Sequence, residues 1–182
     1  MDTISNALKS IIQAVDLCLE NKLILPALIL IYSGIDIVGS LEREEGETSK
    51  ASFIKWANTY LLKEKSLGCS DQDLYAARCG ILHTASAESN LSKSGKALKV
   101  YYAWGTAESN DLRKTGKLID REDNVVIHVS DLFTGFKLGI THHMKDISED
   151  PVRMSNVIER AGKVFSQMPT SLVSDILDST EV

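Results

Sequence analysis

Residues 26–42, PALILIYSGIDIVGSLE, are apolar almost all the way round the helix that their sequence predicts. Pro26 suits the first turn of a helix, because the missing N–H group of proline costs no hydrogen bond there. A helix without a polar face must be surrounded by protein, so we expect this one to be the central buried helix. Ser33, Gly34 and Gly39 are small enough to let another helix approach closely.

Apolar residues at helical spacing predict a helix on each side of the central one. An N-terminal stripe predicts a helix over residues 3–21 and consists of Ile4, Leu8, Ile11, Val15 and Leu19. Residues 43–50 are polar and predict a loop, and a third helix follows around Trp56. Ser70 with Asp73 resembles a capping box, which starts a fourth helix that ends near Thr84.

The second half of the chain predicts a small β-structure followed by helices. Residues 86–96 are rich in small polar side chains and predict a loop. Residues 97–104 and 124–129 have β-strand composition, and we expect them to pair as a long-looped β-hairpin.

Two further helices follow the predicted hairpin. Ser130 or Asp131 is expected to cap a helix over residues 132–147. Asp150 followed by Pro151 is a strong start for a last helix, which we expect to reach about residue 168.

The composition limits the class of protein. The chain has 182 residues, which corresponds to one domain, and its net charge of -5 excludes a uniformly basic nucleic-acid binder. Cys18, Cys69 and Cys79 are scattered, so we predict neither a disulfide framework nor a zinc site. We expect a cytoplasmic protein without a cofactor, a signal peptide or a membrane-spanning segment.

Arg78 and His83 are the most informative pair for function, at the end of the predicted fourth helix. Arginine binds phosphate oxygens with parallel hydrogen bonds, and histidine takes or gives a proton near neutral pH. The pair therefore suits cleavage of RNA through a ribose 2′-hydroxyl without a metal ion. The structural alternative is an Arg–carboxylate pair, with the histidine binding the last carbonyl groups of the helix.

The five-residue spacing of this pair sets a geometric condition. Five steps on an ideal α-helix place the two side chains about 140° apart. They share one site only if the helix is distorted near Gly80, or if two copies of the chain meet around a two-fold axis.

The segment DLYAARCGILHTAS, residues 73–86, resembles the HEPN superfamily. Members are mostly bundles of four or five helices, often dimeric, with an Arg-x(4–6)-His motif late in the domain. The resemblance covers residues 1–90 and also rests on the acid embedded in the central apolar helix. It implies that Arg78 binds the scissile phosphate of RNA and that His83 acts as an acid or base.

Cys79 departs from the HEPN pattern, because a polar residue follows the arginine in many nucleolytic members. This departure favours an alternative function, a non-catalytic HEPN module that binds RNA, a nucleotide or a protein partner. A nucleophilic Cys79 would have only His83 as its base, and a small buried thiol is the plainer interpretation.

Asp36 and Tyr32 are expected to support the site. An unpaired carboxylate in so apolar a helix is costly, so Asp36 needs a partner, and Arg78 is the candidate. The pair either fixes helix packing only, or also orients Arg78 or His83 at the site.

Residues 86–118 form a locally basic segment that also carries Tyr101, Tyr102 and Trp104. Basic and aromatic side chains together bind the backbone and bases of single-stranded nucleic acid. The candidate RNA-binding residues are Lys93, Lys96, Lys99, Arg113, Lys114 and Lys117. The alternative is a solvated hairpin whose aromatic residues face the core or a second copy.

His142, His143 and Asp146 invite a metal-binding interpretation, because His142 and Asp146 are four residues apart on a predicted helix. Two ligands are too few, and no third is evident nearby in the sequence, so we predict no metal site. We expect His128, on a predicted strand, to be packed or exposed.

These observations together predict a mainly α protein. A HEPN-like helical bundle over residues 1–90 is followed, over residues 91–182, by the β-hairpin and two helices, packed on the bundle as one cooperative unit. The favoured function is a metal-independent endoribonuclease of toxin or phage-defence type that acts as a homodimer, with an antitoxin as an expected partner. A purely structural helical dimer is a third alternative.

Overall fold

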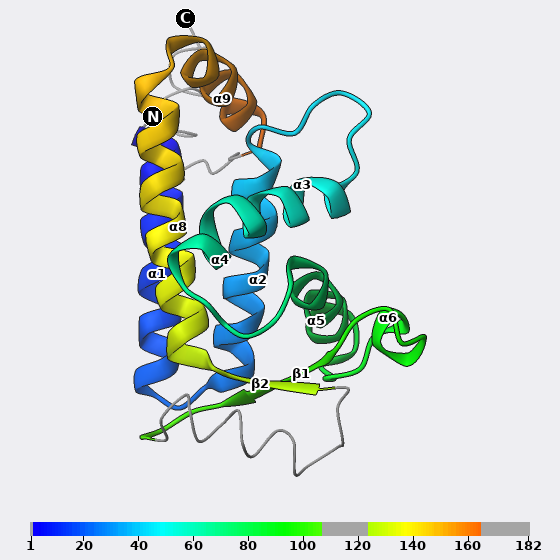
Figure 1. The fold of residues 1–182 in the computed structure, drawn as a ribbon. Coiled ribbons are helices and arrows are strands. Elements are labelled where there is room, and N and C mark those ends of the chain that lie inside the picture. Colours follow the sequence, from blue (N-terminus) through cyan, green and yellow to red (C-terminus); the bar gives the residue numbers. More distant parts are fainter. Residues whose placement is uncertain (1, 107–123, 165–182) are drawn as a thin grey trace, which may run out of the picture.

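The computed structural model describes residues 2–106 and 124–164 and shows a mainly helical protein with a small two-stranded sheet (Figure 1). The long helices are α1 (Asp2–Glu20), α2 (Ile24–Ser40) and α8 (Val129–Glu149). Both α1 and α8 run alongside α2. The prediction of a mainly α fold with a minor β part is confirmed.

The remaining elements surround this frame. They are α3 (Ser49–Trp56), the π-helical turn η1 (Ala57–Leu61), α4 (Leu62–Glu64), α5 (Asp71–Thr84), α6 (Asn90–Lys93), β1 (Lys99–Ala103), β2 (Asn124–His128) and α9 (Pro151–Val164). The helix α6 lies in the segment expected to be a loop, so that expectation is wrong there. Its two serines, Ser89 and Ser92, form a capping box that the sequence analysis overlooked.

The central position predicted for α2 is confirmed, although its burial is less complete than expected. Ile31, Tyr32, Ile35 and Val38 are fully buried. On the other side, Leu25 and Ile29 keep about two-fifths of their surface in solvent, at 39% and 37%.

The small residues of α2 admit neighbouring helices, as predicted. A Cβ atom added at Gly34 would collide with the ring of Phe136 from α8. One added at Gly39 would lie 3.0 Å from the carbonyl oxygen of Ser52 in α3. These contacts of α2 with α8 and α3 therefore depend on the absence of a side chain at Gly34 and Gly39.

A second pair of glycines brings α8 against the π-helical turn. Cβ atoms added at Gly135 and Gly139 would lie 3.1 Å from Lys65 and 3.0 Å from the Trp56 ring, respectively. A π-turn widens a helix by one residue and often marks a functional position. Here it forms the part of the α3–α4 segment on which α8 lies.

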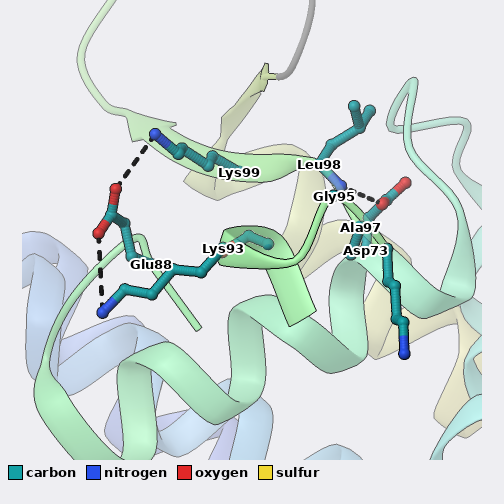
Figure 2. A pocket seen from close by; sticks show the side chains of 9 residues that line it. Asp73, Glu88, Lys93, Gly95, Ala97, Leu98 and Lys99 are labelled. Atoms are coloured by element: carbon teal, nitrogen blue, oxygen red, sulfur yellow. Dashed lines mark hydrogen bonds and ion pairs between the residues drawn. The ribbon is translucent and has the colours of Figure 1, made fainter. Parts of the chain in front are cut away.

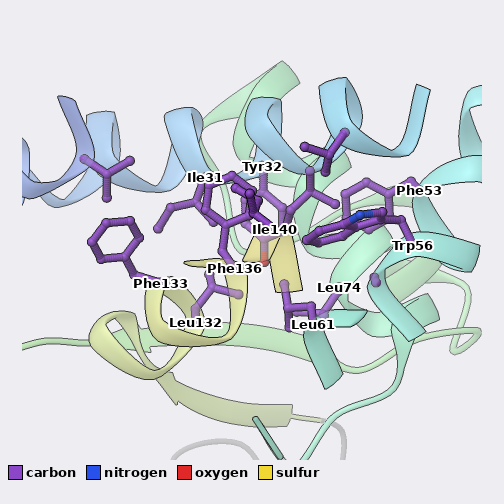
Figure 3. Packing of buried hydrophobic residues seen from close by; sticks show 14 of the residues in the cluster. Ile31, Tyr32, Phe53, Trp56, Leu61, Leu74, Leu132, Phe133, Phe136 and Ile140 are labelled. Atoms are coloured by element: carbon purple, nitrogen blue, oxygen red, sulfur yellow. The ribbon is translucent and has the colours of Figure 1, made fainter. Parts of the chain in front are cut away.

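One hydrophobic core contains residues from both halves of the chain (Figure 3). Tyr32 of α2, Trp56 of α3, Leu61 of η1, and Leu132 and Phe136 of α8 all belong to it, and the Trp56 and Phe136 rings meet edge to face. Cooperative unfolding of the two halves as one unit stays a prediction.

The β-hairpin prediction is wrong, because β1 and β2 pair in parallel, with Lys99 opposite Asn124 and Ala103 opposite His128. A parallel pair needs a long crossover connection, and the chain between Ala103 and Asn124 is long enough to supply one. Alternation along the strands still holds, since Val100, Val125 and Ile127 point into the core.

The ends of the later helices differ in detail from the prediction. The ring of His128, not Ser130 or Asp131, caps α8 by accepting a hydrogen bond from the backbone N–H of Ser130. The carboxylate of Asp150 accepts bonds from two N–H groups in the first turn of α9, which confirms the predicted start of that helix. The predicted end of α9 at residue 168 lies outside the described residues.

Gly34→Ala tests the contact between α2 and α8. The added methyl group must displace the buried Phe136 ring, so we expect the free energy of unfolding to fall by about 1–3 kcal/mol, although alanine favours a helix. Urea unfolding followed by circular dichroism measures the loss. Ser33→Ala is the control on the same helix and should change little, and Gly34→Ala with unaltered or increased stability would contradict the contact.

Candidate functional site

Arg78 on α5 is paired with Asp36 on α2. The guanidinium donates to Asp36 Oδ2 from Nε at 2.8 Å and from Nη2 at 2.7 Å. Both side chains are mostly buried, with 19% of Arg78 and 23% of Asp36 exposed. Arg78 is therefore the partner that the buried carboxylate requires, as the sequence predicted.

Asp36 lies among three basic groups. Burial raises the pKa of its carboxyl group above the ordinary value, and the positive charges of Arg78, Arg43 and His83 oppose that increase. Burial alone would lower the pKa of Arg78, but the hydrogen bonds and charge of Asp36 outweigh burial and raise it. Two arginines and one histidine thus lie near enough to act on this carboxyl group, and the permanent charges of the arginines favour an anion nearby.

Arg78 and His83 lie at the two edges of the exposed face of α5. The helix is a regular α-helix from Asp71 to Thr84, so no distortion at Gly80 brings the two side chains together. Their directions stay about 140° apart. His83 is exposed, and within the described residues no hydrogen bond holds its ring, so the alternative in which it binds the last carbonyl groups is not seen.

Tyr75 and Cys79 lie between these edges. The Arg78 guanidinium stands 5.9 Å from the centre of the Tyr75 ring, and the Lys50 ammonium stands 5.6 Å from it. Burial raises the pKa of Tyr75, and a hydrogen bond with Cys79 adds to the increase. Cys79 is half-buried rather than buried, and its thiol forms no disulfide.

The end of α5 is held by the segment that follows it. Ala85 adopts a left-handed conformation with φ 50°, and the N–H of Ser86 donates to the carbonyl oxygen of Gly80 at 3.2 Å. A Cβ atom at Gly80 would collide with the Ser86 carbonyl oxygen. Glycine at this place therefore lets the chain turn back closely over the helix, which leaves His83 exposed in the last turn.

Tyr32 does not join Arg78, contrary to the expected supporting role. Its side chain is fully buried, and its hydroxyl group lies 2.6 Å from the hydroxyl group of Tyr102 on β1. Burial raises the pKa of Tyr32 well above its ordinary value, and Tyr102 adds to the increase. The Tyr32–Tyr102 pair links α2 to the sheet.

The basic segment is only partly described. Lys93, Lys96 and Lys99 line one cavity, beside α6 and the start of β1. Trp104 is 61% exposed but does not line this cavity. Arg113, Lys114 and Lys117 lie outside the described residues.

A second polar cluster, which the sequence did not predict, joins the segment after α2 to α3, η1, α8 and α9. We call it the His143 cluster, and it consists of Glu42, Trp56, Tyr60, His143 and Arg153. The indole N–H of Trp56 donates to His143 Nδ1 at 3.0 Å, which leaves Nε2 to carry the ring proton and donate to Glu42 at 2.6 Å. Arg153 binds both oxygens of Glu42, at 2.7 and 2.9 Å.

The His143 cluster ties the segment after α2 to α3, η1, α8 and α9. His143 is 1% exposed, and both of its ring nitrogens have partners. A cavity of about 400 Å³ lies beside α2 and α3, and all five residues of the cluster line it. The members are far apart in the sequence, so no local pattern could have revealed the cluster.

The predicted metal-binding candidates have separate partners. His142 Nδ1 lies 2.6 Å from Glu64, His143 belongs to the cluster above, and Asp146 accepts a bond from Tyr60 at 3.1 Å. Among residues 2–106 and 124–164, no group of three or more His, Cys, Asp or Glu side chains is placed to hold a metal ion.

Comparison with protein-family models, curated proteins and solved structures found no match to this chain. The resemblance to HEPN domains therefore stays a prediction that rests on the residues quoted above. Within the described residues, no helix is long and apolar enough to cross a lipid bilayer.

The His143 cluster predicts a loss of stability in acid. The hydrogen bonds from Arg153, followed by that from His143, lower the pKa of Glu42 from 4.5 to about 2. The unfolded chain therefore takes up this proton first, so the stabilisation is complete above pH 4.5 and is lost as the pH falls toward 2. Urea unfolding across this pH range measures the effect.

Glu42→Gln should lower the free energy of unfolding at neutral pH by about 1–3 kcal/mol, because Arg153 loses its charged partner. It should also flatten the dependence on pH below 4.5. Glu45→Gln alters an exposed glutamate and serves as the control. A Glu42→Gln variant with the same acid sensitivity as the natural protein would contradict this assignment.

Proposed function

We propose that this protein cleaves RNA without a metal ion, at a site formed by Arg78 and His83 from two copies of the chain. The observation that carries the proposal is the Arg78–Asp36 pair at the edge of the exposed face of α5, with His83 exposed at the other edge of the same face. The permanent charge of an arginine attracts a phosphate, and the histidine adds a group that transfers protons near neutral pH.

Asp36 positions Arg78 for this role. It binds Nε and Nη2, which fixes the plane of the guanidinium group. In our proposal the remaining Nη1 group donates to an oxygen of the scissile phosphate and stabilises the negative charge that develops there.

The second copy follows from the geometry of α5. Side chains about 140° apart on one regular helix do not converge on one phosphate. If two copies face each other across α5, Arg78 of one lies toward the partner's His83, and a two-fold axis makes the two halves equivalent. Tyr75, Cys79 and Leu82, which are half-buried in one copy, then lie at the contact.

The proposed reaction is an internal transfer within RNA. One His83 accepts the proton of a ribose 2′-hydroxyl group, and the 2′-oxygen forms a bond to phosphorus. The bond from phosphorus to the 5′-oxygen breaks, and the partner's His83, in its protonated form, gives that oxygen a proton. The products are a 2′,3′-cyclic phosphate and a 5′-hydroxyl end, and the rate should depend on pH with a bell shape.

The HEPN resemblance extends the proposal to a biological class. It suggests a cytoplasmic toxin or phage-defence enzyme, held in check by an antitoxin or another protein partner. A non-catalytic HEPN module that binds RNA or a partner is the second candidate. Cys79 and the tight Asp36–Arg78 pair favour this second candidate, since both suit a packed rather than a reacting surface.

The proposal predicts RNA cleavage in the presence of excess chelator. Arg78→Ala and His83→Ala should each lower the rate by about 100-fold or more, because each removes a group that acts in the transition state. Gel analysis of a mixed pool of structured and single-stranded RNA measures cutting, and sedimentation reports whether each variant is dimeric.

His142→Ala is the matched control, because His142 is a partly exposed histidine on another helix. It should cut RNA at the natural rate. Equal cutting by all variants would indicate a contaminant and contradict the site. A folded dimer that binds RNA but does not cut it would favour the non-catalytic module.

A further inference from the structure

The cavity beside the His143 cluster differs in its wall from the cavity beside α6. Polar and small side chains line most of the cavity beside α6, with Lys93 and Lys99 among them (Figure 2). The cavity of about 400 Å³ instead combines aromatic rings with charged groups of both signs. It shares no residue with the Arg78–Asp36 pair, so a ligand bound in it would not depend on RNA cleavage.

One part of the wall is buried and largely aromatic. Trp56, His143 and Val38 line the cavity and are all buried. The centres of the Trp56 and Tyr60 rings lie 5.9 Å apart, and the ring planes are tilted by 38°. The indole N–H of Trp56 and both ring nitrogens of His143 already have partners within the protein. This part of the wall therefore offers a ligand ring faces and apolar surface.

The exposed part of the wall carries the charges. Glu44 and Glu47 end a tight turn, in which the N–H of Glu47 donates to the carbonyl oxygen of Glu44 at 3.2 Å. The N–H of Glu44 in return donates to Glu47 Oε2 at 3.1 Å. Gly46 occupies the third position of the turn with φ 82°, a left-handed conformation that glycine adopts without strain. The turn thus holds two carboxylates at the edge of the cavity.

Lys55 faces these carboxylates from α3. Its ammonium group lies 3.8 Å from Glu44 Oε1, and both side chains are exposed. Within residues 2–106 and 124–164, this is the one carboxylate within ion-pair distance of Lys55. So loose and exposed a pair stabilises the protein little, so the charges of a ligand can replace it at small cost. Glu42 and Arg153, by contrast, bind each other closely and are not available in this way.

We propose that this cavity binds a free amino acid with a large apolar side chain. The side chain of the ligand lies against Trp56 and Tyr60. Its ammonium group binds the carboxylates of Glu44 and Glu47, and its carboxylate binds Lys55. A ligand with an apolar part and both charges uses every part of the wall, and the cavity volume lies within the range of about 300–1,000 Å³ that is typical of small-molecule sites.

Calorimetry of the natural protein with three related compounds tests the proposal. L-Phenylalanine carries both charges, phenethylamine carries only the ammonium group, and 3-phenylpropionate carries only the carboxylate. We expect L-phenylalanine to bind about fivefold more tightly than either comparator, because each comparator loses one exposed ion pair. A comparator that binds as tightly as L-phenylalanine would overturn the proposal, and so would absence of binding by both L-phenylalanine and L-leucine.

Two variants assign the charged groups. Glu47→Gln should weaken binding of L-phenylalanine and phenethylamine about fivefold and should not weaken binding of 3-phenylpropionate. Glutamine still accepts the bond from the N–H of Glu44, so the turn is kept. Lys55→Gln should weaken binding of L-phenylalanine and 3-phenylpropionate and should not weaken binding of phenethylamine. Glu45→Gln alters an exposed glutamate that does not line the cavity, and an effect there as large as in Glu47→Gln would contradict the assignment.

Tryptophan fluorescence places the ligand. The chain has two tryptophans, and Trp104 is exposed and does not line the cavity. In a Trp104→Phe variant all tryptophan emission therefore comes from Trp56. L-Phenylalanine should change this emission with the affinity that calorimetry measures. Heat of binding without any change in the Trp56 emission would place the ligand elsewhere and overturn the proposal.

Discussion

The contact between Gly34 of α2 and the Phe136 ring of α8 is the constraint on which the rest of the structure depends. Because α2 lacks a side chain there, α8 lies directly on it, and Gly139 then brings α8 against the π-helical turn. This position brings the His143 ring within hydrogen-bond distance of both Trp56 and Glu42. The packing of glycines against aromatic rings thus determines where His143 and Glu42 meet.

The C-terminal part of α2 collects those charges. Three of the four arginines of the described residues bind there: Arg78 binds Asp36, Arg160 donates to the carbonyl oxygens of Ser40 and Arg43, and Arg153 binds Glu42. Cations stabilise the negative end of a helix dipole, so these arginines also stabilise the end of α2. The two histidines nearby differ in exposure, since His143 is buried and His83 is exposed.

Short sequence patterns predicted the features that depend on residues close together in the chain or on the chemistry of a single side chain. The apolar α2, the capping box of Ser70 and Asp73, and the need of Asp36 for a cationic partner were all readable from the sequence. The parallel pairing of β1 with β2 and the His143 cluster were not, because each joins segments that are far apart in the chain. Tyr32 was misassigned for the same reason, since its partner Tyr102 lies on a distant strand.

The claim that RNA meets the α5 face rather than the His143 cluster is tested most directly by the ring ¹H–¹⁵N resonances of the four histidines. They would be followed while a 2′-O-methyl RNA, which is not cleaved, is added to the protein. We expect the His83 resonances to shift progressively and those of His143 to stay unchanged. Bound RNA that shifts His143 and leaves His83 unaffected would contradict the proposed site.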